Sequence, residues 1–191
     1  NADLQFTNGI NTADIQEILV RSASDLISLD NPNYQFVAAR LLLYGLRKDV
    51  FGKFDYSPLY DIVVKNVEQG VYDPELLELY TKDDWNQLDS YINHQRDLDF
   101  TYAGMRQVAD KYLVQDRSTG HIYETPQYMY MLISATIFST YPAETRIGYI
   151  RRYYDAISTF KINIPTPIMS GVRTPIRQFA SCVLVDVDDT L

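Results

Sequence analysis

The sequence predicts a mainly α-helical chain with a short α+β ending. Three observations lead to this fold class. Apolar residues recur at helical spacing from about residue 11 to residue 157, and Asn, Thr, Pro and Gly residues mark the ends of the periodic segments. After Phe160 the helical period stops, and short β-branched runs interrupted by proline take its place.

Composition places the chain among globular proteins. Its 191 residues are 46% hydrophobic, which is enough to bury a core. The net charge of -8 argues against a nucleic-acid partner, which needs a basic face. No apolar run approaches the roughly 20 residues that span a bilayer, and no signal-peptide pattern opens the chain, so we expect no membrane association. The single cysteine excludes an internal disulfide framework and indicates a reducing, cytoplasmic location.

Two helices are predicted in the first fifty residues. Residues 11–28 carry an apolar stripe behind the N-cap candidate Asn11. Residues 34–50 follow an Asn-Pro start and end before Gly52. This second segment is apolar nearly all round, so we expect it to be the buried partner of the first.

The middle of the chain predicts further helices and one hairpin. Ser118, Thr119 and Gly120 lie between two short β-type runs, as expected for the turn of a hairpin. The segment "QYMYMLISATIFS" is apolar on every side and predicts a buried helix. The remaining helices are expected around residues 59–70, 73–81, 82–92, 105–113 and 142–157.

Beyond Phe160, the segments "KINIPTPI" and "SCVLVDV" predict buried strands joined by a loop. The second of them holds Cys182, whose simplest role is that of a small buried hydrophobic side chain. A redox or nucleophilic thiol is the functional alternative, because Arg173 and Arg177 are near in sequence and would lower its pKa. In a regular strand the side chains of Ser181 and Cys182 would point to opposite faces. Both residues could then contact one ligand only if Ser181 used its main chain or if the strand were irregular.

Other polar residues carry weaker signals. Hydroxyls at positions 166, 170, 174 and 181 are of the kind that hold a phosphate. Asp186, Asp188 and Asp189 are interpreted as a solvated strand exit, and no metal site is predicted. His94 and His121 are interpreted as surface residues, and most of the sixteen tyrosines as packing residues.

Four segments resemble the large, catalytic subunit of class I ribonucleotide reductase, in the same order along the chain. The most specific is "PTPIMSGVRTPIRQFASCVL", at residues 165–184. The others are "AARLLLYGLRK", "YLVQDRSTGHIYETPQYMYM" and "YPAETRIGYIRRYYDAISTFKINIPTP". Essentially the whole chain is covered by this resemblance.

The resemblance implies a fold and a reaction. Residues 1–52 would be the C-terminal part of an ATP-cone, residues 53–160 a helical region, and residues 161–191 the first strands and active-site loop of a ten-stranded α/β barrel. In this family a thiyl radical removes the ribose 3'-hydrogen, the 2'-hydroxyl leaves as water, and a cysteine pair becomes a disulfide. The product is a deoxyribonucleoside diphosphate.

Individual residues acquire roles from the same resemblance. Cys182 matches one cysteine of the redox pair, Thr166 a substrate diphosphate contact, and Ser181 a residue of the substrate pocket. Thr12 and Lys48 match nucleotide contacts of the ATP-cone, although Gln16 and Gly45 stand where the family often has histidines. The effector loop would begin at Asp189, Thr190 and Leu191, with Asp189 accepting a hydrogen bond from the sugar hydroxyl.

The resemblance also implies partners. No cofactor is expected in this chain itself; ATP and deoxynucleotides would be effectors, and a metal-containing small subunit would supply the radical. A homodimer and a thioredoxin or glutaredoxin reductant are expected as well. The remaining catalytic residues would follow Leu191, so the chain alone is expected to be inactive. A non-catalytic nucleotide-binding or interaction module, or one half of a split reductase, are the alternatives.

Overall fold

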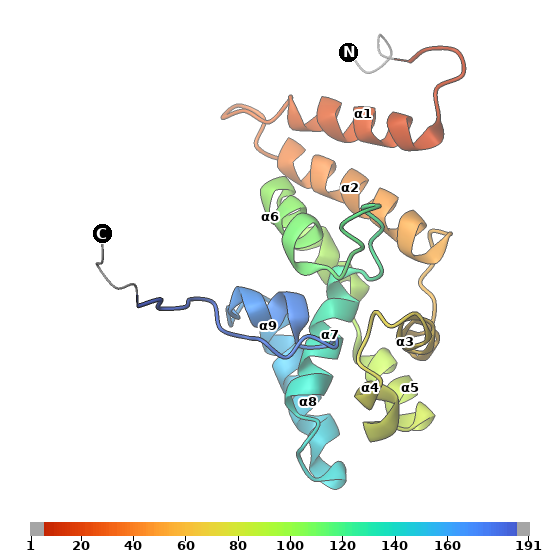
Figure 1. Cartoon of the computed structure of the whole chain (residues 1–191). Helices are drawn as coiled ribbons and strands as arrows, with labels where there is room; N and C mark the ends of the chain where they lie inside the picture. The colour runs from red at the N-terminus through yellow and green to blue at the C-terminus, as the bar shows by residue number, and fades with distance from the viewer. Residues whose placement is uncertain (1–5, 187–191) are drawn as a thin grey trace, which may run out of the picture.

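A computed structural model describes residues 6–186, and over this range the chain is helical with no strand. Figure 1 shows α1 and α2 side by side at one end, α7 and α8 through the middle, and the last described residues extending away from the helices. The elements are α1 (Thr12–Ser24), α2 (Tyr34–Phe51), α3 (Leu59–Glu68), α4 (Glu75–Leu79), α5 (Lys82–Tyr91), the 3-10 helix η2 (His94–Asp99), α6 (Tyr102–Gln107), the π-helix η3 (Val108–Tyr112), α7 (Pro126–Ile137), α8 (Ala143–Ser158) and α9 (Thr166–Gly171).

The first helical pair forms as predicted, with one correction. Asn11 caps α1, and its side chain accepts a hydrogen bond from the Ala13 amide at 2.7 Å. Gly52 ends α2 in the left-handed conformation, with φ of 69°. Helix α2 contributes more buried residues than α1, as expected of the buried partner, but it is not enclosed, since Val37 and Tyr44 remain 44% and 46% exposed. Helices α1, α6 and η2 cover only part of the surface of α2, and Val37 and Tyr44 lie on the part that faces solvent.

Helix α7 is the core of the molecule. Every residue from Pro126 to Ala135 is buried, as its predominantly apolar sequence predicts. Helix α8 packs along it, and η2 and α9 contact it from other directions. Helix α7 therefore positions the elements that carry the polar clusters described below.

The predicted hairpin is present as a turn whose two arms are joined by a single β-bridge. The Asp116 amide donates to the His121 carbonyl at 2.8 Å, and Gly120 adopts a φ of 76°. A single antiparallel bridge joins Gln115 and Ile122. Just before the hairpin, the predicted helix over residues 105–113 divides into α6 and η3, and the Leu113 amide donates to the Val108 carbonyl at 3.0 Å, five residues earlier.

The two predicted strands at the end of the chain are not present in the described residues. Residues 161–165 are irregular, and Thr166 then starts α9, with Pro167 in its first turn, where a missing amide costs nothing. Ser181 to Asp186 are irregular and exposed, and Leu184 is 99% exposed. Val187, the last residue of "SCVLVDV", lies outside the described range. A strand needs a neighbour for its backbone hydrogen bonds, and residues 6–186 supply none here.

Between residues 6 and 186, no helix combines the length and the apolar character that crossing a membrane requires.

Candidate functional site

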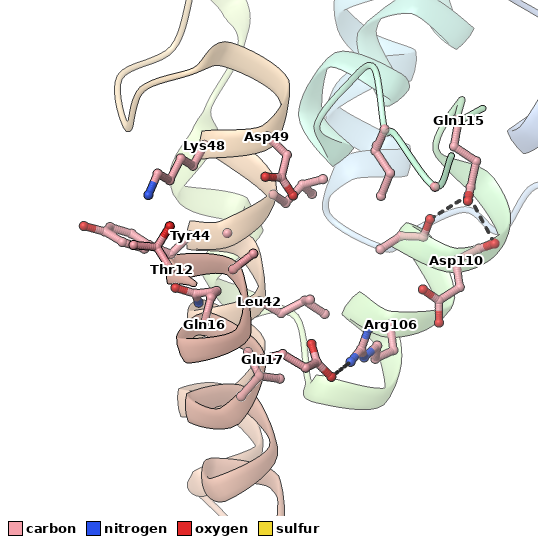
Figure 2. Close-up of a pocket in the computed structure, with 17 residues that line it drawn as sticks. Thr12, Gln16, Glu17, Leu42, Tyr44, Lys48, Asp49, Arg106, Asp110 and Gln115 are labelled. Atoms are coloured by element: carbon pink, nitrogen blue, oxygen red, sulfur yellow. Dashed lines mark hydrogen bonds and ion pairs between the residues drawn. The ribbon is translucent and has the colours of Figure 1, made fainter. Parts of the chain in front are cut away.

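A cavity of about 480 Å³ lies between the first helical pair and the segment formed by α6, η3 and the hairpin. Thr12 and Lys48, which the sequence predicted as nucleotide contacts from two different helices, both line it. Figure 2 shows Thr12, Gln16, Tyr44 and Lys48 at one end, with Asp110 and Gln115 across from them. The cavity has the size of a small-molecule site.

Charge is unevenly distributed around this cavity. Lys48 and Arg106 are its two cations, and Arg106 forms an ion pair with Glu17 at 2.8 Å (Figure 2). Asp49 and Asp110 add two more carboxylates to the lining. An anionic ligand would therefore place its phosphates at the Lys48 end, since the other cation is already paired.

Gln16 and Gly45 form a packed pair between α1 and α2. The Gln16 side-chain amide donates to the Leu41 carbonyl at 2.6 Å, and a Cβ added at Gly45 would lie 3.1 Å from Gln16 Cγ. The two residues therefore fit one another: the glycine leaves room, and the glutamine side chain fills it. The Gln16 side chain thus links α1 to α2.

The predicted substrate residues lie on an exposed part of the chain. Thr166 is exposed at the start of α9, and Cys182 is exposed on the irregular segment beyond it. The interpretation of Cys182 as a buried hydrophobic side chain is wrong in the described chain. The Ser181 hydroxyl donates to Cys182 Sγ at 3.8 Å, so these residues share one side because the segment is irregular. Within residues 6–186, no hydrogen bond links Thr166 to Cys182.

The expected influence of Arg173 and Arg177 on the thiol is not supported by their contacts. Arg173 is fully buried, and it forms an ion pair with Glu124. Arg177 pairs with Asp73. Both guanidinium groups hold the preceding chain in place.

Glu124 is the centre of a network whose side chains, those of Glu124, Arg173 and Tyr72, are fully buried. It accepts hydrogen bonds from Arg173 Nε at 2.8 Å, from the Tyr72 hydroxyl at 2.7 Å and from the Val114 amide at 2.8 Å. Arg173 also donates to the carbonyls of Met169 and Tyr112, at 2.6 and 2.9 Å. Burial, and then the Glu124 charge, raise the pKa of Tyr72 well above its usual range, so its hydroxyl remains a donor.

Comparison with known proteins gives consistent matches along the chain. The family model described as "Ribonucleotide reductase, all-alpha domain" matches residues 98–177. Over 188 residues, which is 98% of this chain, identity is 55% to "Ribonucleoside-diphosphate reductase 1 subunit alpha" of Escherichia coli (strain K12). It is 56% to the protein of the same name from Salmonella typhimurium, and 54% to "Ribonucleoside-diphosphate reductase subunit alpha" of Haemophilus influenzae.

The chain belongs to the ribonucleoside-diphosphate reductase alpha-subunit family. The predicted resemblance to an N-terminal part of the class I large subunit is thereby confirmed. The chain spans about a quarter of the length of these relatives. The all-α description of the matched domain agrees with the helices observed over residues 98–177.

A second buried polar cluster in this reductase-family chain joins α2, η2 and α7. The His94 ring stacks on Tyr56 with centroids 3.3 Å apart, and the Arg47 guanidinium lies 4.4 Å from the Tyr56 ring centroid. Asp97 is buried and accepts a hydrogen bond from Gln127 at 2.8 Å. The prediction of a surface residue is therefore wrong for His94, whereas His121 is exposed as expected.

Burial moves the pKa values of this second cluster in opposite directions. It raises the pKa of Asp97 to about 7, because the charged carboxylate is poorly solvated there. It lowers the pKa of His94 to about 4, and the nearby Arg47 charge acts in the same direction. The sequence did contain one signal for this cluster, since Gln127 is a polar residue inside an otherwise apolar helix and so needs a buried partner.

The remaining predicted site residues of the reductase-family chain, Asp189, Thr190 and Leu191, lie outside the described residues. Between residues 6 and 186, no three His, Cys, Asp or Glu side chains gather as a metal site would require.

Proposed function

We propose that this chain is part of a ribonucleotide reductase large subunit that reduces ribonucleoside diphosphates to deoxyribonucleoside diphosphates. The observation that carries the proposal is the 55% identity to a ribonucleoside-diphosphate reductase alpha subunit over 98% of the chain. The fold of residues 98–177 supports it, since the family model for this segment is all-α as well. The protein would work in the cytoplasm.

Cys182 would be one member of the redox-active cysteine pair. In the overall reaction the ribose 2'-hydroxyl leaves as water, two thiols give up two electrons and two protons, and a disulfide forms between them. Exposure of Cys182 supports this role, because a buried thiol would not reach a substrate. The second thiol and the thiyl-forming cysteine would come from parts of the longer protein outside this chain, since Cys182 is its only cysteine.

Thr166 and Ser181 would contact the substrate. Both side chains are exposed hydroxyls, and Thr166 stands at the start of α9, where a diphosphate can approach it. Asp189, Thr190 and Leu191 would begin the effector loop, with Asp189 accepting a hydrogen bond from the sugar hydroxyl of a deoxynucleotide.

The cavity beside α1 and α2 would take an ATP-type effector. Lys48 would supply a positive charge for the phosphates and Thr12 a hydroxyl, and the volume of about 480 Å³ suits a small molecule. In this division of the chain, residues 1–52 belong to an ATP-cone, residues 53–160 to a helical region, and residues 161–191 to the start of the catalytic barrel. Gln16 and Gly45 would help hold the cone helices together without contacting the nucleotide.

The partners follow from the same reaction. A small subunit with a metal centre would supply the radical, and thioredoxin or glutaredoxin would reduce the disulfide after each turnover. The large subunit would act as a homodimer. The net charge of -8 disfavours nucleic acid as a further partner.

The decisive experiment substitutes Cys182 in the full polypeptide that contains this chain. With the radical-supplying subunit and a dithiol reductant present, Cys182→Ser should abolish formation of deoxyribonucleoside diphosphate, because serine cannot form the disulfide. Ser181→Ala is the neighbouring control and should leave measurable turnover. Full activity of Cys182→Ser would refute the assigned role.

A non-catalytic nucleotide-binding module is the second candidate, favoured by the fact that residues of this chain alone line the cavity. A split reductase whose other half is a separate chain is a form of the first proposal. Mixing this chain with the remaining segment of the reductase distinguishes the enzyme from the non-catalytic module. Recovered nucleoside diphosphate reduction that is lost in Cys182→Ser supports the enzyme, whereas ATP binding with no reduction in any combination supports the module.

A further inference from the structure

We propose that Glu124 and Arg173 are positioning residues that hold α9, and with it the Thr166 hydroxyl, in the place where the substrate is bound. The inference rests on the proposed function, in which Thr166 contacts the diphosphate. Neither residue would touch the substrate, because both side chains are completely buried. Their effect would pass through hydrogen bonds to the chain around α9.

Helix α9 depends on neighbouring groups for its position. It has only six residues, and a helix of this length is not stable by itself. Arg173 follows its last turn, and its Nη1 donates to the Met169 carbonyl inside the helix at 2.6 Å. The Arg173 main-chain carbonyl also accepts from the Asp73 amide at 3.0 Å, so both parts of this residue are fixed.

Helix η3 connects Arg173 to α9. Arg173 Nη2 donates to the Tyr112 carbonyl at 2.9 Å, which fixes the backbone of η3. Helix η3 packs against α9, whose first residue is Thr166. A shift of the Arg173 guanidinium would therefore move the segment against which α9 packs.

Glu124 provides the fixed end of this arrangement. It lies at the end of the hairpin, directly before Thr125 and α7, and α7 is the most deeply buried helix. Its two carboxylate oxygens accept from Arg173, from the Tyr72 hydroxyl and from the Val114 amide. A buried charge pair is tolerated only when its hydrogen bonds are made together, so the network has one well-defined arrangement.

The test uses the complete large subunit with its radical-supplying partner. KM and kcat for a ribonucleoside diphosphate are measured, together with the Kd of the same nucleotide by equilibrium dialysis. For Arg173→Lys we expect KM and Kd to rise about tenfold with kcat changed less than about threefold, because binding is lost and the reacting thiols are untouched. Lysine keeps the charge but cannot reproduce the planar fork of hydrogen bonds.

Two further variants keep the inference testable if Arg173→Lys does not fold. Tyr72→Phe removes one donor to Glu124 and retains the ring, and it should raise KM about threefold. Asp155→Asn is the matched control, since it removes an ion pair of α8 with Arg96 that has no contact with Arg173. Its KM should equal that of the unsubstituted enzyme.

A double variant decides whether Arg173 acts through Thr166. If it does, Thr166→Ala combined with Arg173→Lys should raise KM no further than the more damaging single variant. Multiplicative effects, or an unchanged KM in a folded Tyr72→Phe enzyme, would overturn the inference while leaving the proposed function intact. An unsubstituted enzyme that neither binds nor reduces nucleoside diphosphates would overturn both.

Discussion

Asp97 and His94 show how single residues in one cluster respond differently to burial. The folded state holds the Asp97 proton more tightly than the unfolded chain, because the pKa of this carboxyl rises from 3.8 to about 7. Its contribution to stability is full below about pH 4 and declines as the pH rises toward 7. For His94 the pKa falls from 6.5 to about 4, so its contribution is full above pH 6.5 and declines toward pH 4. The two effects oppose each other between these limits.

Replacing Asp97 should remove its pH-dependent contribution to stability and leave that of His94. We compare the free energy of unfolding of Asp97→Asn with that of the unsubstituted chain at each pH. This difference should shift in favour of the variant by about 3 kcal/mol between pH 4 and pH 7, since one pKa unit corresponds to about 1.4 kcal/mol. Urea unfolding at a series of pH values measures this difference. Identical pH profiles for the two proteins would contradict the raised pKa.

His94→Phe should produce the opposite trend. The phenyl ring can retain the stack on Tyr56 but cannot titrate. Relative to the unsubstituted chain, its free energy of unfolding should therefore increase as the pH falls from 6.5 to 4. The same urea titrations measure it, and a difference that does not vary with pH would argue against a neutral, buried imidazole.

The role of Lys48 can be examined by nucleotide binding. Lys48→Ala should weaken ATP binding about tenfold, because it removes the cation that lines the cavity without an ion pair in the described chain. Lys53→Ala, two residues after the end of α2 and outside the cavity lining, is the charge-matched control. Isothermal titration of the full polypeptide measures both, and equal affinities would remove Lys48 from the site.

Among the elements, α5 has the most complete N-terminal cap. The Thr81 hydroxyl accepts from the Asp84 amide at 3.1 Å, and the Asp84 carboxylate accepts from the Thr81 amide at 2.8 Å. The cap matters because α5 buries Trp85 and Leu88 against the core. Local capping thus supports a large buried side chain.

Thr81→Ala should lower the free energy of unfolding by about 1 kcal/mol, the usual value for an N-cap. Ser90→Ala near the other end of α5 is the control, and it should change stability by less than about 0.5 kcal/mol because its exposed hydroxyl bonds only the local Gln87 carbonyl. Chemical denaturation compares the two. Equal losses would show that the cap contributes nothing specific.

At the scale of the whole molecule, stability should differ between the first helix and the core. Helix α1 packs chiefly on α2, whereas α7 is surrounded by α8, η2 and α9. Local opening of α1 needs little apolar surface to be exposed, so its amides should exchange with solvent faster than those of α7. Hydrogen exchange with mass spectrometry measures this order. Equal protection of α1 and α7 would show that the chain opens as one unit.

The sequence predicted the helices that have strong periodicity and clear boundaries. Helix α1 begins after Asn11 and α2 ends before Gly52 as expected, and α7 is buried on all sides. It did not predict the pairing of Glu124 with Arg173, because the residues are 49 positions apart and isolated charges usually lie on the surface. The turn of η3 was also missed, since a π-helix has the same apolar pattern as an α-helix over five residues.

Family membership was determined by the sequence alone, because motifs along the chain carry it. The redox role of Cys182 is a proposal that rests on the same motifs. The tertiary structure decided which charges are buried and which helices surround the cavity, because these depend on contacts between distant segments. The structure also showed that the strands expected at the end of the chain are not formed in the described residues. β-branched residues indicate a preference for extended backbone, but only a neighbouring strand can satisfy their hydrogen bonds, and residues 6–186 provide none there.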